Sequence, residues 1–480
     1  MRVIMKTCHS CSIVVHALAV LAAACLSTRI LACDTWVALG NSTRDGSVIM
    51  AKNSDRKITE AQPLVYFPRT RHPEGSMVKC TDRSIPQVAE TYEHIGSQLS
   101  WTFGYEHGLN EWGVAIGNEA IKSKVPPANA GLIGMDLIRL ALERGRTAYE
   151  AMHVIIDHLE LQGRGSNSFI VADPSSAWVL ETAGKYWAAK KVTDVYAISN
   201  IYTIERDFDE AHPDLIKHAI AQGWCSSEET FNFSRCYTRA DKDYSAAHNR
   251  ACQVSSLLHK HKGSITVELV MNEINRSHHE GTIEAPKWSP NDGWFSTVCM
   301  HNGPNHGRTS ASMVAHLRKD NPPLLRSVYW ASFSSPCVNV FKPFYFAGRT
   351  VPESYGIGKD IYNAESPWWW AERVKRQCDL NYNKLAPLAA AVFRETEQWE
   401  LAKSRRIENE VTRLSLANRE DEARQLLRDF SRECCARIEK EYAQLHALLD
   451  AKILEFGVDY LQIDALREAS KTNALVLPGL

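Results

Sequence analysis

Three patterns of hydrophobic and polar positions follow one another along the chain. Residues 1–32 contain one apolar run behind a basic start. From Cys33 to about Tyr345, short β-prone runs alternate with turn residues and with stretches of helical apolar spacing. From about Ile361 onward, long charged segments carry apolar residues at helical spacing, which is typical of amphipathic helices. We therefore divide the chain into a leader (1–32), an α+β domain (33–360) and a C-terminal helical region (361–480).

Two strand groups and one helical stretch make up the predicted α+β domain. Thr35–Leu39 and Val48–Asp55 flank the turn-forming run GNSTRDGS and predict a hairpin. Asn167–Asn200 predicts three or four further strands. Between these groups, Gly131–Leu159 has apolar residues at helical spacing, and Gly145 divides it into two predicted helices. Helices between antiparallel strand groups favour layered α+β packing over a doubly wound parallel sheet.

The predicted hairpin allows two registers. If the loop spans Asn41–Gly46, Cys33 lies opposite Ser54. If the turn is the tight DG pair within that loop, Cys33 lies opposite Ile58 instead. Either register brings the sequence KNSDR of the second strand close to Cys33.

The apolar run near the N-terminus has the features of a signal peptide. Arg2 and Lys6 precede Ile13–Leu26, which is too short for a comfortable membrane span. Ala32 fits the last position before signal-peptidase cleavage, which makes Cys33 the first residue of the mature chain. We therefore expect an exported protein, secreted or held in a periplasmic or other secretory lumen, with no membrane span.

The C-terminal region is long, charged and without internal repeats. The charged stretch Leu385–Phe456 predicts two or three amphipathic helices packed on the α+β domain. A coiled-coil arm that joins two copies of the chain is the alternative, which leaves a homo-oligomer open.

Composition and cysteine usage narrow the classes of partner. The formal net charge is −1 and no basic stripe is present, so we expect no nucleic-acid partner. Three of the 13 cysteines lie in the leader, and no CxxC pair follows it. A zinc ribbon is therefore not expected, and we assign no metal ligands and no cofactor. His278 and His279 beside Glu280 do not change this, because adjacent side chains on a strand point to opposite faces.

Cleavage before Cys33 would create a residue with two reactive groups. An α-amino group has a pKa of about 7.7–8.0, against about 10.4 for a lysine side chain, so it is substantially neutral near pH 7.5. This amine can accept the proton of its own thiol, which makes one residue both nucleophile and general base. In the neighbouring KNSDR sequence, Asp55 is suited to hold the amine, and Lys52 or Arg56 to stabilise the thiolate.

The segment from Cys33 to Arg56 closely resembles the N-terminus of the dipeptidase/secernin family, peptidase family C69, in the N-terminal-nucleophile hydrolase superfamily. Further similar blocks follow in the same order as in the family. They are HGLNEWGVAIGNEAI (His107–Ile121), NSFIVADPSSAWVLETAGKYWAA (Asn167–Ala189), AISN (Ala197–Asn200), HHEGT (His278–Thr282), STVCMH (Ser296–His301), ASMV (Ala311–Val314) and WASFSSPCVNVFKPFY (Trp330–Tyr345). The resemblance implies a four-layer αββα sandwich with a C-terminal helical extension, and amide-bond hydrolysis through a thioester acyl-enzyme.

The related penicillin V and bile-salt amidases share this layout and imply roles for residues at the start of the chain. Their nucleophile matches Cys33, and the aspartate of their RNxD motif matches Asp55. The arginine of that motif is replaced by Lys52. Any role that needs a planar guanidinium is therefore in doubt here, because lysine offers only a point charge.

The resemblance also implies three catalytic residues from later blocks. Asn200 matches the asparagine that stabilises the oxyanion, and Asn118 matches the asparagine after the NExG block. An oxyanion needs aimed donors, which the Asn200 amide and a backbone N–H near Asn118 are suited to supply. The late arginine of the amidases matches Arg235, with Arg239 as the alternative alignment.

A dipeptide substrate carries an ammonium group and a carboxylate, so its pocket should carry charge at both ends. Acidic residues accompany the matching blocks at Glu106, Glu111, Glu119 and Glu280. Glu119 and Glu280 are the first choices for binding the ammonium. The sequence thus predicts a cysteine-dependent dipeptidase that acts on small peptides. The alternatives are an N-acyl amide hydrolase of the penicillin V or bile-salt amidase type, a non-enzymatic secernin-like protein, and a protein anchored by a lipid on Cys33.

Overall fold

The computed structural model of the chain describes residues 32–128, 130–162, 165–239, 244–283, 285, 296–301, 307–458 and 463–478. Residues 1–31 of the predicted leader lie outside this part. The described residues belong to one compact unit. Within them, no helix combines the length and the apolar character needed to cross a membrane.

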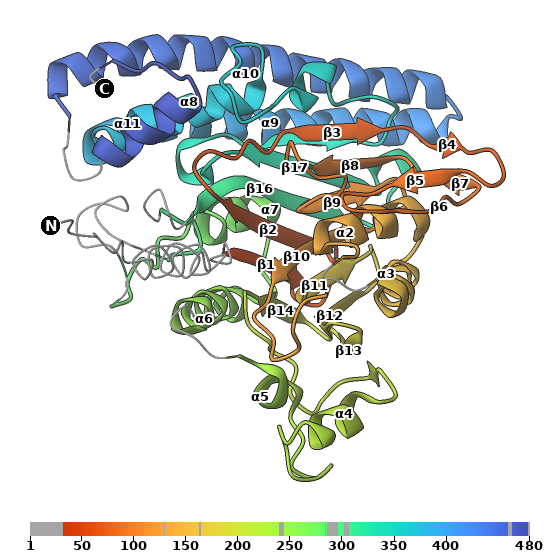
Figure 1. The fold of residues 1–480 in the computed structure, drawn as a ribbon. Helices are drawn as coiled ribbons and strands as arrows, with labels where there is room; N and C mark the ends of the chain where they lie inside the picture. Colours follow the sequence, from red (N-terminus) through yellow and green to blue (C-terminus); the bar gives the residue numbers. More distant parts are fainter. Residues whose placement is uncertain are drawn as a thin grey trace, which may run out of the picture. The chain divides into compact units, whose positions relative to one another are not determined.

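Two antiparallel β-sheets form the centre of the fold (Figure 1). In the described part of the chain, sheet A has the strand order β14 (Val195–Ile198), β1 (Cys33–Ala38), β2 (Val48–Arg56), β16 (Arg308–Leu317), β17 (Ser327–Phe333) and β18 (Lys342–Tyr345). Sheet B has the order β15 (Glu210–Ala211), β13 (Tyr186–Lys191), β12 (Ala177–Ala183), β11 (Asn167–Ala172), β10 (Ala115–Ala120), β9 (His107–Asn110), β8 (His94–Ser97) and β3 (Leu64–Phe67). Two short ribbons between β3 and β8 pair β4 (Thr70–Arg71) with β7 (Glu90–Thr91) and β5 (Met77–Lys79) with β6 (Ser84–Pro86).

Helices account for the remaining regular structure. Those within the α+β part are α2 (Gly134–Arg144), α3 (Ala148–Gln162), α4 (Leu215–Ala221), α5 (Phe233–Tyr237), α6 (Tyr244–Lys260), α7 (Val267–Leu269), the π-helix η1 (Val270–Ile274) and the 3-10 turns η2 (Pro323–Leu325), η3 (Pro336–Val338) and η4 (Glu353–Gly356). The C-terminal region forms α8 (Pro367–Asp379), α9 (Tyr382–Leu416), α10 (Glu420–Phe456) and α11 (Ile463–Thr472).

The alternation of side chains along each strand creates three separate apolar interfaces. On β1, Val37 packs between the two sheets, whereas Trp36 and Ala38 pack outward against α6 and the C-terminal helices. On β10 of sheet B, Ala115 packs between the sheets, and Ile116 packs outward against α2 and α3. The layers are therefore helices, sheet B, sheet A and helices, so the prediction of an αββα sandwich is confirmed.

The predicted hairpin has the longer of the two loops. Cys33 pairs with Ser54 and Ala38 with Ile49, so the tight-turn register is wrong. Gly46, in the loop, has φ 78°, a conformation that glycine adopts without steric cost. The strands predicted over Asn167–Asn200 form β11 to β14, and Gly145 caps α2 as expected.

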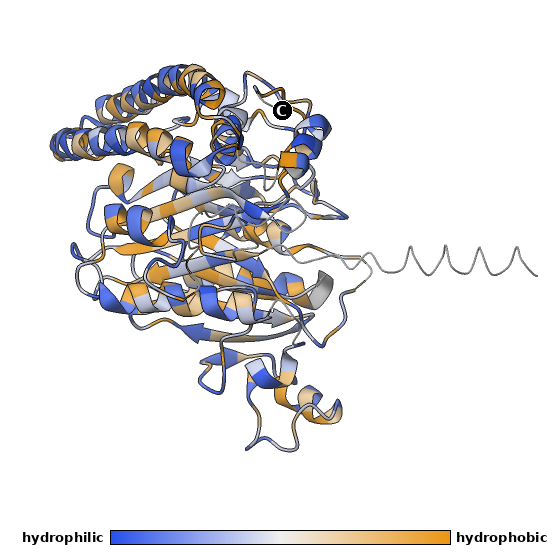
Figure 2. Ribbon diagram, turned by 90° about the vertical axis from the view of Figure 1, so that its left-hand side faces the viewer, coloured by the Kyte–Doolittle hydropathy of each residue, from blue (hydrophilic) through white to orange (hydrophobic). Residues whose placement is uncertain are grey.

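The C-terminal region packs on the sandwich rather than projecting from it. Helices α9 and α10 contact each other along their lengths, and both contact β18. Figure 2 shows hydrophobic and hydrophilic residues interspersed along these two helices. Their apolar side, including Val411 and Phe430, is buried with Trp330 and Tyr345 of sheet A. Two helices, α9 and α10, form over Leu385–Phe456, within the predicted two or three, and α8 and α11 flank them. The domain boundary at residue 360 stays a prediction.

Candidate active site

Cys33 opens β1 with its thiol turned into the space between the two sheets. Alternation from Val37 places Cys33 and Thr35 on this inner side and Asp34 on the outer side. Thr35 Oγ1 donates a hydrogen bond across the gap to Glu119 on β10, which shows that the two sheets meet here. Cys33 is only 5% exposed, so the thiol is shielded from solvent.

An ion pair inside the sandwich faces the thiol. Lys52 lies on the inner side of β2, and its Nζ donates to the carbonyl of Asn118 and lies 3.2 Å from Glu119 Oε1. Burial raises the pKa of Glu119 to about 7, although Lys52 opposes the rise. Burial also works against the charge on Lys52, but the neighbouring Cys33 and Glu119 outweigh it, so the Lys52 pKa lies above its ordinary value. Gly117 leaves room for this lysine, since a Cβ there would lie 2.8 Å from Lys52 Cδ.

The thiol itself touches groups from β2 and from the segment before β9. The Asp55 N–H donates to Cys33 Sγ at 3.4 Å, and Glu106 Oε2 lies 3.9 Å from the sulfur. Burial raises the pKa of the Cys33 thiol; the charge of Lys52 opposes this rise, and those of Glu106 and Asp55 add to it. In this state the thiol keeps its proton, so attack on a carbonyl requires a nearby base.

A second cluster of charges lies on the outer side of β1 and β2. Arg250 Nε on α6 lies 3.1 and 2.9 Å from the two carboxylate oxygens of Asp34. Thr309 Oγ1 donates to Asp55 Oδ1 at 2.7 Å, while Asp55 Oδ2 is buried without a hydrogen-bond partner among the described residues. Burial, reinforced by the charge of Asp34, raises the pKa of Asp55 well above its ordinary value.

The backbone nitrogen of Cys33 is held by Asn200, just after β14. This nitrogen, here in the peptide bond to Ala32, donates to Asn200 Oδ1 at 2.9 Å. The same oxygen accepts a hydrogen bond from Arg250 at 2.9 Å, and Asn200 Nδ2 donates to the carbonyl of Ala120 at 2.9 Å. The oxygen end of the amide thus faces the nitrogen that cleavage before Cys33 would convert into an amine.

The other expected site residues occupy different surroundings. The side chain of Asn118 points outward from sheet B and donates to Asn167, so only its backbone carbonyl meets Lys52. Arg235 is exposed on α5, and its hydrogen bonds within the described residues use its backbone. Glu280 is 68% exposed and accepts a hydrogen bond from the backbone of His278. The structure therefore unites Cys33 with Lys52, Asp55, Asn200 and Glu119, and no contact within the described part of the chain joins Arg235 or Glu280 to Cys33.

Two neighbours of this site are absent from the residues assigned from sequence. In the sequence, Glu106 is one of four acidic residues beside the matching blocks; in the structure its side chain is nearly buried and pairs with Arg56 at 3.1 Å. The sequence patterns assign no role to Arg250. It falls on the buried stripe of α6 with Ala247 and Val254, where a charged residue needs a partner. A charged residue among apolar positions of a helix is therefore the sequence feature that could have identified Arg250.

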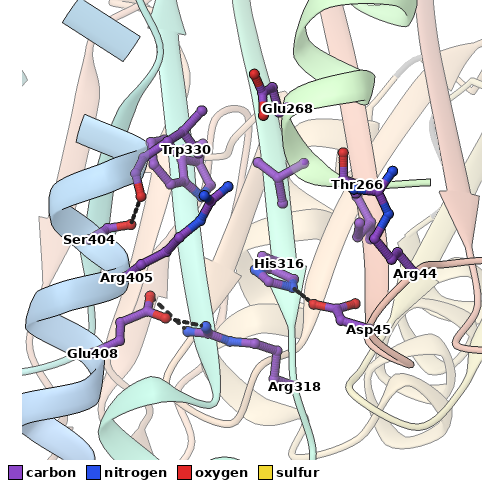
Figure 3. Close-up of a pocket in the computed structure, with 13 residues that line it drawn as sticks. Arg44, Asp45, Thr266, Glu268, His316, Arg318, Trp330, Ser404, Arg405 and Glu408 are labelled. Carbon is purple, nitrogen blue, oxygen red and sulfur yellow. Dashed lines mark hydrogen bonds and ion pairs between the residues drawn. The ribbon is translucent and has the colours of Figure 1, made fainter. Parts of the chain in front are cut away.

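The hollow drawn in Figure 3 is a different place on sheet A. This pocket has a volume of about 260 Å³ and contains His316, whose Nε2 lies 3.0 Å from Asp45 Oδ2. It also contains Ile49, five positions from Ser54 along β2, which corresponds to roughly 17 Å. The pocket therefore lies apart from Cys33 and its partners.

Comparison with known proteins assigns the chain to a family. The sequence model of peptidase family C69 matches residues 32–259 and 226–395. Two curated relatives from Streptococcus pyogenes, both named "Probable dipeptidase A", are 24% identical; they align over 74% and 73% of this chain and 84% and 82% of their own. Among solved structures, penicillin V acylase from Agrobacterium tumefaciens is 16% identical, with a TM-score of 0.39 over 66% of this chain and 87% of its own. A mutant conjugated bile acid hydrolase from Clostridium perfringens is 12% identical, with a TM-score of 0.37 over 65% of this chain and 92% of its own.

Proposed function

The chain belongs to peptidase family C69 and is an amide-bond hydrolase; from this premise we propose that it is an exported dipeptidase whose nucleophile is Cys33, freed by cleavage after Ala32. The observation that carries the proposal is the position of Cys33. At the start of β1, its nitrogen donates a hydrogen bond to Asn200, and its thiol faces Lys52 and Glu106 inside the sandwich.

The amine supplies the base that the buried thiol lacks. Once the Ala32–Cys33 bond is cut, the free amine takes the thiol proton, and the sulfur attacks the carbonyl carbon of the substrate. We assign the resulting ammonium to the Asp55 carboxyl as its partner, and it returns its proton to the leaving amine. Water then hydrolyses the thioester and releases the first amino acid. Lys52 favours the thiolate because its charge opposes the effect of burial on the Cys33 pKa.

Asn200 positions the amine and serves the oxyanion. Its Oδ1 accepts from the Cys33 nitrogen, which fixes the amide group beside the reacting carbon. The Nδ2 of the same amide is the side-chain donor that we assign to the tetrahedral oxygen. Such donors commonly contribute about 10²–10³ in turnover.

Glu106 is the residue we assign to the substrate ammonium, in place of Glu119 and Glu280. The α-ammonium of a dipeptide lies two bonds from the carbonyl carbon that the sulfur attacks. A carboxylate oxygen 3.9 Å from the sulfur, as in Glu106, is therefore within reach of it. Glu119 is already paired with Lys52. Arg56, which pairs with Glu106 at 3.1 Å, holds this carboxylate in position.

Matched substrates test this assignment on the mature enzyme. Kinetics should be measured on a dipeptide, its N-acetyl derivative and the corresponding tripeptide. We expect acetylation to remove most of kcat/KM, because the amide has no charge for Glu106, and the tripeptide to be poorer than the dipeptide. An acetylated series that is equal or better would replace the dipeptidase proposal with N-acyl amide hydrolysis. Intact mass of the protein recovered from its secretory compartment checks the cut before Cys33.

A further inference from the structure

Two histidines and two cysteines converge in the structure outside the Cys33 site. One ligand atom from each of His278, Cys299, His301 and Cys337 lies within 4.8 Å of all the others. His301 Nε2 is the common neighbour: it lies 3.1 Å from His278 Nε2, 3.6 Å from Cys299 Sγ and 3.3 Å from Cys337 Sγ. Three of the four residues are buried, and His278 is partly buried.

These separations fit a tetrahedral zinc ion. With Zn–S of about 2.3 Å and Zn–N of about 2.0–2.1 Å, neighbouring ligand atoms of a tetrahedron lie about 3.3–3.8 Å apart. We propose that His278, Cys299, His301 and Cys337 form a structural Cys₂His₂ site for Zn²⁺. Four protein ligands leave no open position, as is usual for structural rather than catalytic zinc.

Two further residues, Tyr382 and Glu280, contact the proposed zinc ligands without being ligands themselves. Tyr382 Oη at the start of α9 donates to Cys337 Sγ at 3.3 Å, which suits a thiolate. The Glu280 carboxylate lies 3.6 Å from Nδ1 of His278, leaving the Nε2 of that ring directed at the cluster. A carboxylate on the far nitrogen of a histidine is a common companion of zinc ligation. This contact gives Glu280 a role distinct from substrate binding.

Zinc at this site would connect three segments that are distant in the sequence, one of which is hydrogen-bonded to Thr309, the partner of Asp55. The ligands come from the residues after η1, from the segment before β16 and from η3, and Tyr382 adds the C-terminal helices. Between Cys299 and His301, the N–H of Met300 donates to Thr309 Oγ1 at 2.9 Å, and Thr309 donates to Asp55. Zinc at this point would therefore hold the residue that positions Asp55.

Cys299 and Cys337 could instead form a disulfide in an oxidising compartment, which would leave no thiolates for zinc. The test uses the full mature chain carrying Cys33→Ser, so that the Cys33 thiol cannot bind metal. The protein is equilibrated with Zn²⁺ and a competing chelator, and bound zinc is measured by elemental mass spectrometry. We expect about one zinc per chain, an at least tenfold weaker affinity in Cys337→Ser and His301→Ala, and no change in the control Cys80→Ser, a buried cysteine outside the cluster.

A second readout does not depend on the folding of variants. Replacement of zinc by Co²⁺ in the parent protein should give the visible absorption of tetrahedral cobalt and a thiolate charge-transfer band in the near ultraviolet. The absence of bound metal, an octahedral cobalt spectrum, or undiminished affinity in Cys337→Ser would overturn the proposal. A Cys299–Cys337 disulfide found by peptide mapping of the protein isolated from its secretory compartment would also overturn it.

Discussion

The backbone nitrogen of Cys33 donates a hydrogen bond to Asn200 Oδ1 at 2.9 Å, although the two residues lie 167 positions apart. The pairing of β1 with β14 explains this contact. Thr35 pairs with Ile198, and the same register extended by two residues sets Asn200 opposite Cys33. The start of β1, which carries Cys33, therefore lies next to the Asn200 amide that follows β14.

Removal of the Asn200 amide should lower turnover more than it lowers stability. We expect Asn200→Ala to lose about 10²–10³ in kcat, because the oxyanion loses a donor and the Cys33 nitrogen loses its acceptor. Asn41→Ala is the control, since Asn41 also donates to a backbone carbonyl but lies exposed in the hairpin loop. Steady-state kinetics on both purified variants measure the loss of kcat. A wild-type kcat in Asn200→Ala would show that this residue has no part in the mechanism.

Neutralisation of Glu106 should abolish the preference for a free α-amine. Breaking a desolvated ion pair commonly costs about 2–5 kcal/mol, which is roughly 30- to several-thousand-fold in kcat/KM. Glu106→Gln should lose this on a dipeptide and lose little on its N-acetyl derivative. Glu60→Gln is the matched control, because Glu60 also pairs with Arg56. If the two variants keep the same selectivity as the wild type, the ammonium binds elsewhere.

The buried carboxyl of Glu119 should make stability depend on pH. Burial raises its pKa from the ordinary 4.5 to about 7 in the folded chain, against the opposing charge of Lys52. A raised folded-state pKa gives stability that is fully present below about 4.5 and is lost as pH rises through about 7. Relative to Glu119→Gln, the wild type should lose roughly 3 kcal/mol of unfolding free energy over this window. Urea unfolding of both proteins from pH 4.5 to 8 measures the difference, and a difference that does not vary with pH contradicts the account.

Gly117 should not tolerate a methyl group. Its Cβ would lie 2.8 Å from Lys52 Cδ and 2.9 Å from Thr35 Oγ1, both of which are held in place. We expect Gly117→Ala to cost about 1–3 kcal/mol of unfolding free energy. At Gly356 the nearest atom to a new Cβ is Val65 Cγ1 at 3.6 Å, so Gly356→Ala should cost less. Equal melting temperatures for the two variants would mean that the packing around Lys52 adapts.

The sequence predicted the hairpin, but it left the register open and did not give the direction of every side chain. Turn residues between two β-prone runs predicted the hairpin, but the sequence allowed Cys33 to lie opposite either Ser54 or Ile58, and the structure shows the Ser54 pairing. On β10, however, both faces are buried, so the sequence carries no contrast that tells which face points inward. Asn118 and Glu119 therefore looked equally close to the site, whereas only the Glu119 side chain lies between the sheets.

The site residues that the sequence did not identify are brought together by contacts between distant segments. Glu106 reaches Cys33 because it precedes β9, which pairs with β10, and β10 packs on β1 and β2 of sheet A; nothing in its local sequence indicates that packing. The four residues of the proposed zinc site come from three segments without the short ligand spacing by which zinc sites are recognised. Arg250 was the exception, because a charge on an apolar helical stripe is visible in the sequence.

The central claim is that the amine of Cys33 is the base for its own thiol. The most direct measurement compares two preparations of the mature chain, one beginning at Cys33 and one with a single extra methionine before it. Intact mass must verify both N-termini in the samples assayed. The thiol is the same in both, so a loss of about 10²–10⁴ in kcat/KM with the extra residue is the result we predict for a missing general base. Equal activity of the two chains, with the methionine still attached, would contradict it.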